Sequence, residues 1–338
     1  MSSTDTTPKP IVASTLARRP VIRIRTSWVP VLAAVAILIV MFVAAQLYFG
    51  RFLTPRLISS LLVDNAYLVV LAAGMTFVIL SGGIDLSVGA VMAFTGMLAA
   101  KLLVIGVPPL VVIPTMIAAG AMFGLIIGIM VHYFDVQPFI ASLAGMFLAR
   151  GLCFVVSLEA IQVKDPIVLG LQSTKLGDFE WYITPTGIIA LLVIAVAAFV
   201  LGYTRFGRTV YAIGGNEHSA RLMGLPVARS KVLVYVISGI CAGIAGLLFT
   251  SYTAAGYSLN GIGTELDTIA AVVIGGTLLT GGSGYAIGSL IGVLVYGVIK
   301  VSITFLGADS SWTRITIGVL LLAFVVVQRL IVRRANRH

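Results

Sequence analysis

Residues 204–231 read TRFGRTVYAIGGNEHSARLMGLPVARSK and form the longest polar, basic interruption between apolar blocks. Basic loops of membrane proteins tend to face the cytoplasm, which predicts a cytoplasmic position for this stretch. Asn216 is suited to N-cap a short helix with Glu217 in its first turn, and Gly224 before Leu225-Pro226 predicts its end. The stretch is either a capped helix that contacts a partner or an ordinary loop that only sets topology. Its basic residues are Arg205, Arg208, Arg221, Arg229 and Lys231.

The chain as a whole is too apolar for a water-soluble domain. Of its 338 residues, 59% are hydrophobic and 10% are charged, whereas soluble domains carry roughly 25% charged residues. Its mean hydropathy is +1.10. The predicted fold class is therefore an all-α polytopic membrane protein. The formal net charge of +10 does not indicate nucleic-acid binding, because the basic residues gather in the tails and the central loop, where topology explains them.

About ten apolar blocks are each near the length that a bilayer requires. An N-terminus inside the cell then places the loop 204–231 and the C-terminus inside, and the acid-rich loop 159–181 outside. Arg51 and Arg56 fall on the outer side and count against this arrangement. The blocks cover residues 28–50, 58–80, 85–105, 108–131, 137–158, 183–203, 231–255, 266–282, 285–306 and 314–332.

The first apolar block is too long for the apolar region of a typical signal peptide and lacks a clear cleavage site. We therefore predict that it is retained as a membrane span. Three parts of the chain follow from this: a flexible basic cytoplasmic tail at 1–27, a transmembrane domain at 28–332, and a basic cytoplasmic tail at 333–338.

Motifs for nucleotide, metal and catalytic chemistry are missing from the sequence. It has no Gly-x-x-x-x-Gly-Lys-Ser/Thr phosphate loop and no His-Glu-x-x-His or Cys-x-x-Cys pair for a metal ion. Cys153 and Cys241 lie in apolar runs and are expected to be packing residues. We therefore expect a chain that is not an enzyme and that holds no cofactor of its own.

Polar side chains inside apolar blocks are costly, and they usually face a protein interior or a water-filled cavity. Asp85 follows two helix-breaking glycines, so either Asp85 or Ser87 can cap the next helix. The alternative is that Asp85 contacts a substrate, and capping preferences favour the cap. Arg150 lies deep in its block, which predicts an interior partner or a cavity. The candidate translocation residues are Asn65, Ser81, Asp85, Ser87, Phe139, Phe147, Arg150 and Asp267.

The chain contains a weak internal echo. Residues 80–89 read LSGGIDLSVG and residues 279–288 read LTGGSGYAIG. Transporters often carry internal repeats with interrupted helices at corresponding positions. The predicted topology gives both segments the same direction, so the echo does not show an inverted repeat. Two similar glycine-rich turns between helices are the favoured interpretation.

Three long motifs follow one another along the chain. Residues 74–89 read GMTFVILSGGIDLSVG, residues 205–224 read RFGRTVYAIGGNEHSARLMG, and residues 267–282 read DTIAAVVIGGTLLTGG. In this order they resemble the first signature, the cytoplasmic coupling segment and the second signature of permease subunits of ribose-type bacterial ABC sugar importers. The resemblance extends from the first apolar block to the last. Residues 143–147, 255–257 and 310–312 look closest to a galactofuranose permease subunit.

The resemblance implies a division of labour in the bacterial inner membrane. A separate ATPase dimer binds ATP and Mg²⁺, two permease chains form the pathway as a homodimer or heterodimer, and a periplasmic binding protein delivers a monosaccharide. Galactofuranose or a related furanose or pentose is the expected sugar. The coupling residues would insert into a cleft of the ATPase and transmit its rigid-body closure. They are Gly214, Gly215, Asn216, Glu217, Ala220, Arg221, Leu222, Met223 and Gly224.

Two candidate contacts follow from this picture. Phe139 and Phe147 either stack on a sugar ring or pack against protein and lipid, and packing is the commoner role of single aromatic residues in a span. The segments 159–181 and 256–265 are expected to meet the binding protein, because both are polar and lie outside in the predicted topology.

Two other classes of protein compete with this interpretation. An ion- or proton-coupled secondary transporter needs a relay of buried ionisable groups, for which Asp85, Arg150 and Lys300 are a thin basis. A membrane-embedded enzyme needs a catalytic constellation, and the sequence shows none. A neighbouring gene for an ATPase would favour the importer over both.

Overall fold

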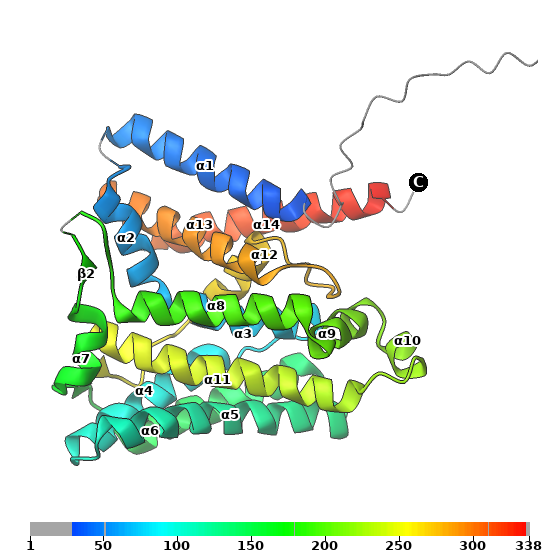
Figure 1. The fold of residues 1–338 in the computed structure, drawn as a ribbon, viewed down its shortest axis with the longest axis horizontal. Helices are drawn as coiled ribbons and strands as arrows, with labels where there is room; N and C mark the ends of the chain where they lie inside the picture. The colour runs from blue at the N-terminus through cyan, green and yellow to red at the C-terminus, as the bar shows by residue number, and fades with distance from the viewer. Residues whose placement is uncertain (1–28, 51, 179, 310, 336–338) are drawn as a thin grey trace, which may run out of the picture.

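The computed structural model describes residues 29–50, 52–178, 180–309 and 311–335. The predicted tail 1–27 and the end of the predicted tail 333–338 lie outside these residues. Long helices run side by side across the molecule (Figure 1), with short strands at one end. The helices are α1 (Val29–Phe49), α2 (Pro55–Asp64), α3 (Ala66–Leu80), α4 (Val88–Val104), α5 (Pro109–Tyr133), α6 (Pro138–Val156), α7 (Pro166–Ser173), α8 (Pro185–Tyr203), α9 (Arg205–Gly215), α10 (Glu217–Leu222), α11 (Val227–Thr253), α12 (Thr264–Ile274), α13 (Ala286–Phe305) and α14 (Ser311–Ala335).

Four two-residue strands form two antiparallel pairs. β2 (Leu176–Gly177) pairs with β3 (Tyr182–Ile183) within the predicted outer loop. β1 (Ile161–Gln162) pairs with β4 (Ala255–Gly256), which follows α11. The second pair therefore joins two segments that are almost a hundred residues apart in the sequence.

Several helices begin at residues that the sequence marks as helix starts. Thr184 precedes Pro185, and its side chain accepts a hydrogen bond from the backbone N–H of Gly187. Thr204 closes α8 and opens α9, because its hydroxyl donates to the carbonyl of Val200 and accepts from the N–H of Gly207. A single residue thus ends a membrane helix and starts a separate helix at its cytoplasmic end.

The core is built around α3, in which every residue is buried. It packs against α8, α11, α12 and α13. A second close contact joins α5 and α11, where Gly120 and Gly239 leave no room for a Cβ atom on either helix. Small residues of this kind let helix backbones approach closely in a membrane, where association depends on packing. Cys153 and Cys241 are buried and free, as expected of packing residues.

The described chain contains six helices that are long and apolar enough to cross a membrane, or seven if α2 and α3 count as one span bent by 54°. The prediction of ten spans is not confirmed. α4 has 17 residues, and the predicted block 266–282 is helical only to Ile274. Gly276 follows the end of α12 with a left-handed φ of +97°. Glycine adopts this conformation at little energetic cost because it has no side chain.

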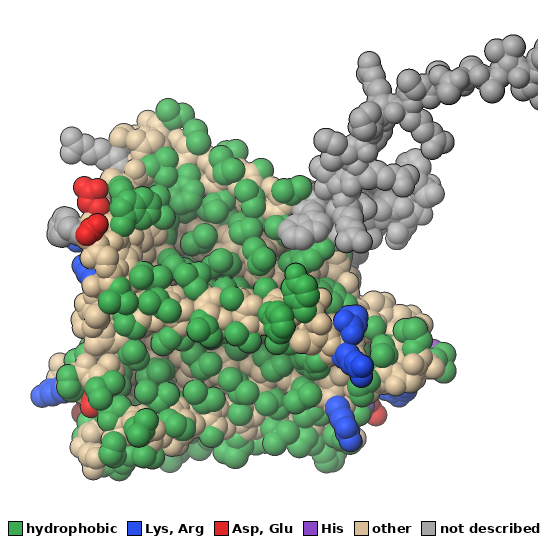
Figure 2. Space-filling view, viewed as in Figure 1, with side chains coloured by type: hydrophobic (Ala, Val, Ile, Leu, Met, Phe, Trp, Pro, Cys, Tyr) green, Lys and Arg blue, Asp and Glu red, His purple; other side chains and the backbone are tan. Residues whose placement is uncertain are grey.

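The two ends of the helix bundle carry different elements. Figure 1 places α9, α10 and the last turn of α14 at one end, and α7 and β2 at the other. Figure 2 shows an apolar belt between them, with the charged side chains of this face confined to the ends. This arrangement agrees with the predicted sidedness, in which 204–231 faces the cytoplasm and 159–181 faces outward.

Candidate functional site

The three motifs meet at one place near the cytoplasmic end. We call residues 80–83, 214–215 and 281–282 the glycine junction. The N–H of Gly282 donates a 2.9 Å hydrogen bond to the carbonyl of Leu80. A Cβ atom on Gly214 would overlap both of these backbone groups. The echoed segments of the sequence are therefore two turns in direct contact, and a glycine of the coupling segment packs against both.

Ser81 lies in this junction, and its hydroxyl donates to the carbonyl of Val78 in its own helix. It is buried. The structure thus places this translocation candidate at the end of α3, in backbone packing.

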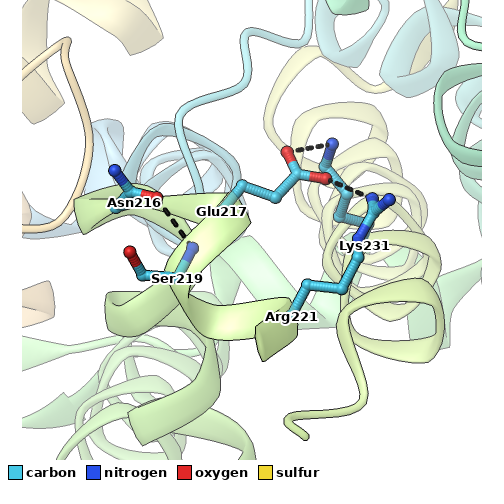
Figure 3. A network of polar contacts seen from close by, with 5 residues as sticks. All are labelled: Asn216, Glu217, Ser219, Arg221 and Lys231. Carbon is cyan, nitrogen blue, oxygen red and sulfur yellow. Dashed lines mark hydrogen bonds and ion pairs between the residues drawn. The ribbon is translucent and has the colours of Figure 1, made fainter. Parts of the chain in front are cut away.

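The next residues form the predicted capped helix, α10 (Figure 3). The Asn216 side chain accepts a 2.8 Å hydrogen bond from the N–H of Ser219, which confirms the N-cap. Gly224 has a φ of +75°, and the N–H of Leu225 donates to the carbonyl of Ala220, which closes the helix end. Six residues are too few for a stable isolated helix, so these caps and the contacts below hold it in place.

Glu217 ties α10 to α11 (Figure 3). Its carboxylate pairs with Lys231 at 2.7 Å and with Arg221 at 3.1 Å. Partial burial raises the pKa of this carboxyl, but the hydrogen bond and charge of Lys231, with the charge of Arg221, outweigh burial and bring the pKa below its usual value. Glu217 is therefore an anionic link between a loop helix and a membrane helix.

The two faces of α10 differ in character. Ala220 is buried in a small apolar cluster with Ile213 and Val227. On the outside, the side chains of Leu222 and Met223 are 76% and 67% exposed. α10 and its C-cap residue therefore present two large apolar side chains at the surface of the described chain.

Asp85 makes a tertiary contact where the sequence favoured a simple cap. One carboxylate oxygen accepts from the N–H and hydroxyl of Ser87, at 2.9 and 2.6 Å. The other accepts from the Ser238 hydroxyl on α11 at 2.7 Å. Ser87 occupies the N-cap position of α4 without a side-chain cap bond. Both oxygens are engaged and the side chain is buried, so Asp85 joins the 81–87 turn to α11.

The segment after β4, which is predicted to meet the binding protein, runs beside α4. Gly256 packs against Ala100 of α4, and Gly261 packs against Gly89 and Met92 of the same helix. Between these points the chain runs beside α4 from the level of Gly96 and Met97 to that of Gly89 and Met92, in turns rather than in a helix. Backbone of this kind occurs at membrane depth only where it is buried in protein or lines a water-filled cavity. We call residues 257–263 the inner turn segment.

Arg150 holds this segment. Its Nη1 atom donates to the carbonyls of Ser258 and Asn260, at 2.6 and 2.7 Å. This supplies donors to backbone groups that no helix satisfies, and it confirms the expected interior partner. Phe147 lies one turn earlier on α6 and is exposed, as is Phe139, so the structure leaves open both of their predicted roles.

Asn65 and Asp267 lie beside a group of aromatic residues that the sequence analysis missed. The Tyr296 hydroxyl donates to Asp267 at 3.0 Å, and the next residue, Gly297, packs against the Asn65 amide. One ring is packed edge-on against another at 4.8 Å, Tyr67 on Phe249. Tyrosines in apolar blocks resemble ordinary interface anchors, so no sequence signal distinguished them.

We call this group the outer aromatic cluster: Asn65, Tyr67, Phe249, Tyr252, Asp267 and Tyr296. Its polar atoms are not all used within the chain. The Asn65 side-chain oxygen is buried without a hydrogen-bond partner in the described chain. So is one oxygen of Glu265, a residue near Arg150 in the first turn of α12 that sequence reasoning also missed.

Comparison with known proteins bears directly on these features. A family model described as branched-chain amino acid transport system / permease component matches residues 57–325. The chain belongs to this family. Among curated relatives, the fructose import permease protein FruG of Bifidobacterium longum (strain NCC 2705) is 42% identical over 311 residues, covering 89% of this chain and 91% of that protein.

Two relatives from Escherichia coli (strain K12) are also similar to this permease. The inner membrane ABC transporter permease protein YjfF is 43% identical, with 89% of this chain and 92% of that protein covered. The ribose import permease protein RbsC is 37% identical, with 82% and 87% covered. No solved structure matches the permease.

These similarities confirm the predicted class. The permease is a multi-pass inner-membrane subunit of a ribose-type ABC sugar importer, and it is a transport component rather than an enzyme. Importers of this family work with an ATPase and a binding protein. Two of the relatives named above are described for fructose and ribose, the description of YjfF names no sugar, and none of the three names galactofuranose.

Proposed function

We propose that this permease carries a furanose or pentose monosaccharide, with galactofuranose as the first candidate. It would act beside a second permease chain and be driven by ATP and Mg²⁺ on a separate ATPase. The observation that carries the transport pathway is the inner turn segment, non-helical backbone along α4 that Arg150 holds by two carbonyls. The names of the relatives, fructose, ribose and allose, support a monosaccharide.

The pathway would run along the inner turn segment and past the outer aromatic cluster. A sugar presents hydroxyl groups at its edge and C–H groups on its faces. Asp267 is only partly buried, and its carboxylate offers an acceptor for a hydroxyl group. Tyr252 is exposed beside Tyr67 and offers a ring face. Apolar surface with a few placed polar groups is typical of small-molecule sites.

The coupling element would be α10. Its exposed Leu222 and Met223 would enter a cleft of the ATPase, and its motion would reach the membrane through the link from Glu217 to Lys231. The helix α11 that carries Lys231 packs against α3, α4 and α5. Rigid elements that move as bodies are a common means of such transmission.

The binding protein would dock at the opposite end. Loop 159–181 provides α7, β1 and β2 there, and β1 joins it to β4, the strand that leads into the inner turn segment. Crosslinks from this loop to the binding protein should form with substrate present. A complete set of cysteine probes over 164–178 that yields no crosslink would contradict the docking site.

The pathway is tested by Arg150→Leu and Arg150→Lys, measured by ATP-driven sugar uptake in proteoliposomes with the ATPase, the binding protein and the second permease. Arg150→Leu leaves two carbonyls without donors, and we expect at least about a tenfold loss of uptake. Arg150→Lys keeps the charge and should retain more. Uptake equal to the unaltered permease in both variants would remove Arg150 from the pathway. Uptake that needs an ion gradient and no ATP would favour the secondary transporter.

The coupling role is tested by a matched pair of exposed leucines, Leu222 on α10 and Leu176 in the outer loop. Leu222→Asp should abolish uptake and weaken ATPase binding, while Leu176→Asp should leave ATPase binding unchanged. Both variants should keep the melting temperature of the isolated permease. If Leu222→Asp binds ATPase normally, α10 is not the docking helix.

Candidate sugars are ranked in the same uptake assay, with galactofuranose, ribose and fructose compared at equal concentration.

A further inference from the structure

A groove beside α8 borders the glycine junction at Gly282, but its lining includes no residue of α10, of the inner turn segment or of the outer aromatic cluster. It encloses about 1050 Å³ between α8, α9 and residues 282–287. Its long wall is the apolar face of α8, which includes Ile194, Ala198 and Phe199. Arg208 and Tyr211 of α9 line one end of the groove. The groove is therefore apolar along one membrane helix and basic at the end where the chain turns along the cytoplasmic edge.

The charge of Arg208 is available for a ligand. Its side chain is exposed, and the ion pairs of the described residues involve Glu217 with Arg221 and Lys231 instead. The described lining of the groove contains no acidic residue. Tyr211 donates its hydroxyl to the carbonyl of Gly284 at 2.7 Å, which fixes α9 against the turn before α13. A basic group thus stands at the mouth of a groove whose walls are tied together.

We propose that this groove binds an anionic phospholipid of the cytoplasmic leaflet, with its phosphate at Arg208 and an acyl chain along α8. Several observations support this occupant. The apolar wall leads away from the cytoplasmic end that α9 and α10 mark (Figure 1), which is the direction of an acyl chain. Basic pockets between membrane helices on this side suit anionic head groups. A sugar would find few hydrogen-bond partners on α8, and an apolar protein surface would leave Arg208 unpaired.

The test places a tryptophan in the groove. Phe199→Trp supplies a reporter that stacks near Tyr203, and the same protein with Phe199 gives the background from the native tryptophans. The permease is reconstituted in phosphatidylcholine nanodiscs with a small fraction of bromine-labelled phosphatidylglycerol or bromine-labelled phosphatidylcholine. We expect the anionic lipid to quench the introduced tryptophan as strongly as if its concentration at the groove were about five times that of the neutral lipid. This ratio corresponds to the attraction of an anionic lipid to one basic residue at a membrane surface.

Two arginine variants distinguish binding in the groove from general attraction of anionic lipid to the basic end of the protein. Arg208→Gln should abolish the preference for the anionic lipid, and Arg229→Gln, an exposed arginine on the same side but outside the groove, should keep it. Equal quenching by both lipids overturns the proposal, and so does a preference that survives Arg208→Gln. Loss of the preference on adding glycerol 3-phosphate would assign the site to a soluble phosphate instead. The assay needs no sugar and no ATPase, so its outcome is independent of the proposed transport function.

Discussion

The glycine junction and α10 lie next to each other in the sequence but use their residues in opposite ways. Gly214 is enclosed by the backbone of Leu80 and Gly282, while its neighbour Gly215 has open space where a Cβ would stand. The junction depends on the absence of side chains, and α10 depends on which side chains it presents. One motif therefore contains an enclosed packing position at Gly214 and an exposed helix, α10, with only Gly215 and Asn216 between them.

The largest effect is expected when the junction is filled. Gly214→Val would force side-chain atoms into two backbone groups that cannot turn aside, so the cost should exceed the 1–3 kcal/mol, roughly, of ordinary overpacking. We expect little folded protein, seen as aggregation in size-exclusion chromatography of the detergent extract. Gly215→Val is the matched control, because its site is open, and it should extract as a folded protein with impaired uptake. Equal behaviour of the two variants would contradict the contrast between neighbours.

A middle-sized effect is expected at the link between the 81–87 turn and α11. Ser238→Ala removes the donor to one Asp85 oxygen, and an unsatisfied buried group costs about 1–3 kcal/mol. The melting temperature of the permease should fall. Ser142→Ala is the control, because that buried hydroxyl donates only to carbonyls of its own helix, α6. A larger fall in melting temperature for Ser142→Ala than for Ser238→Ala would show that the Ser238 hydroxyl is not needed by Asp85.

The smallest effect on stability is expected at the edge of α10. Glu217→Gln removes two ion pairs that are partly open to solvent, and such pairs contribute below about 1 kcal/mol. Because the folded-state pKa of Glu217 is lowered, its contribution is complete above the usual value of 4.5 and is lost as the pH falls through the lowered value. The melting-temperature difference from the unaltered permease should therefore shrink at acidic pH.

The comparison for this measurement is Glu159→Gln. Glu159 is an exposed acid of the outer loop, and the ion pairs of the described residues do not include it. Its replacement should leave the melting temperature nearly unchanged at every pH. A difference at Glu217 that grows on acidification would reverse the sign of the argument.

Local chemistry was predictable from the sequence, and assembled chemistry was not. The N-cap at Asn216 and the stop at Gly224 depend on neighbours within a few residues, so both could be predicted. The end of α12 at Ile274 was missed because hydropathy stays high through residues 277–279, beyond the glycines that break the helix. Asn65 and Asp267 were singled out by their polarity, but their aromatic neighbours come from three other helices.

The path of the chain after α11 was not predicted. Residues 257–263 run along α4, with Ser258 buried and Leu259 and Ile262 exposed. Only the partners reveal this, since the donors to its carbonyls come from Arg150, over a hundred residues earlier in the chain. Contacts at such separation leave no local pattern.

The short ladder between β1 and β4 has a mechanical consequence. It fastens Ile161 and Gln162 of the outer loop to Gly256 and Ala255, and the N–H of Val163 extends it to the carbonyl of Ala254. A displacement of residues 161–163 therefore also displaces residues 254–256, which lead into the inner turn segment beside α4. While these bonds hold, neither segment can shift without the other, so a displacement of the outer loop is transmitted to the start of the inner turn segment.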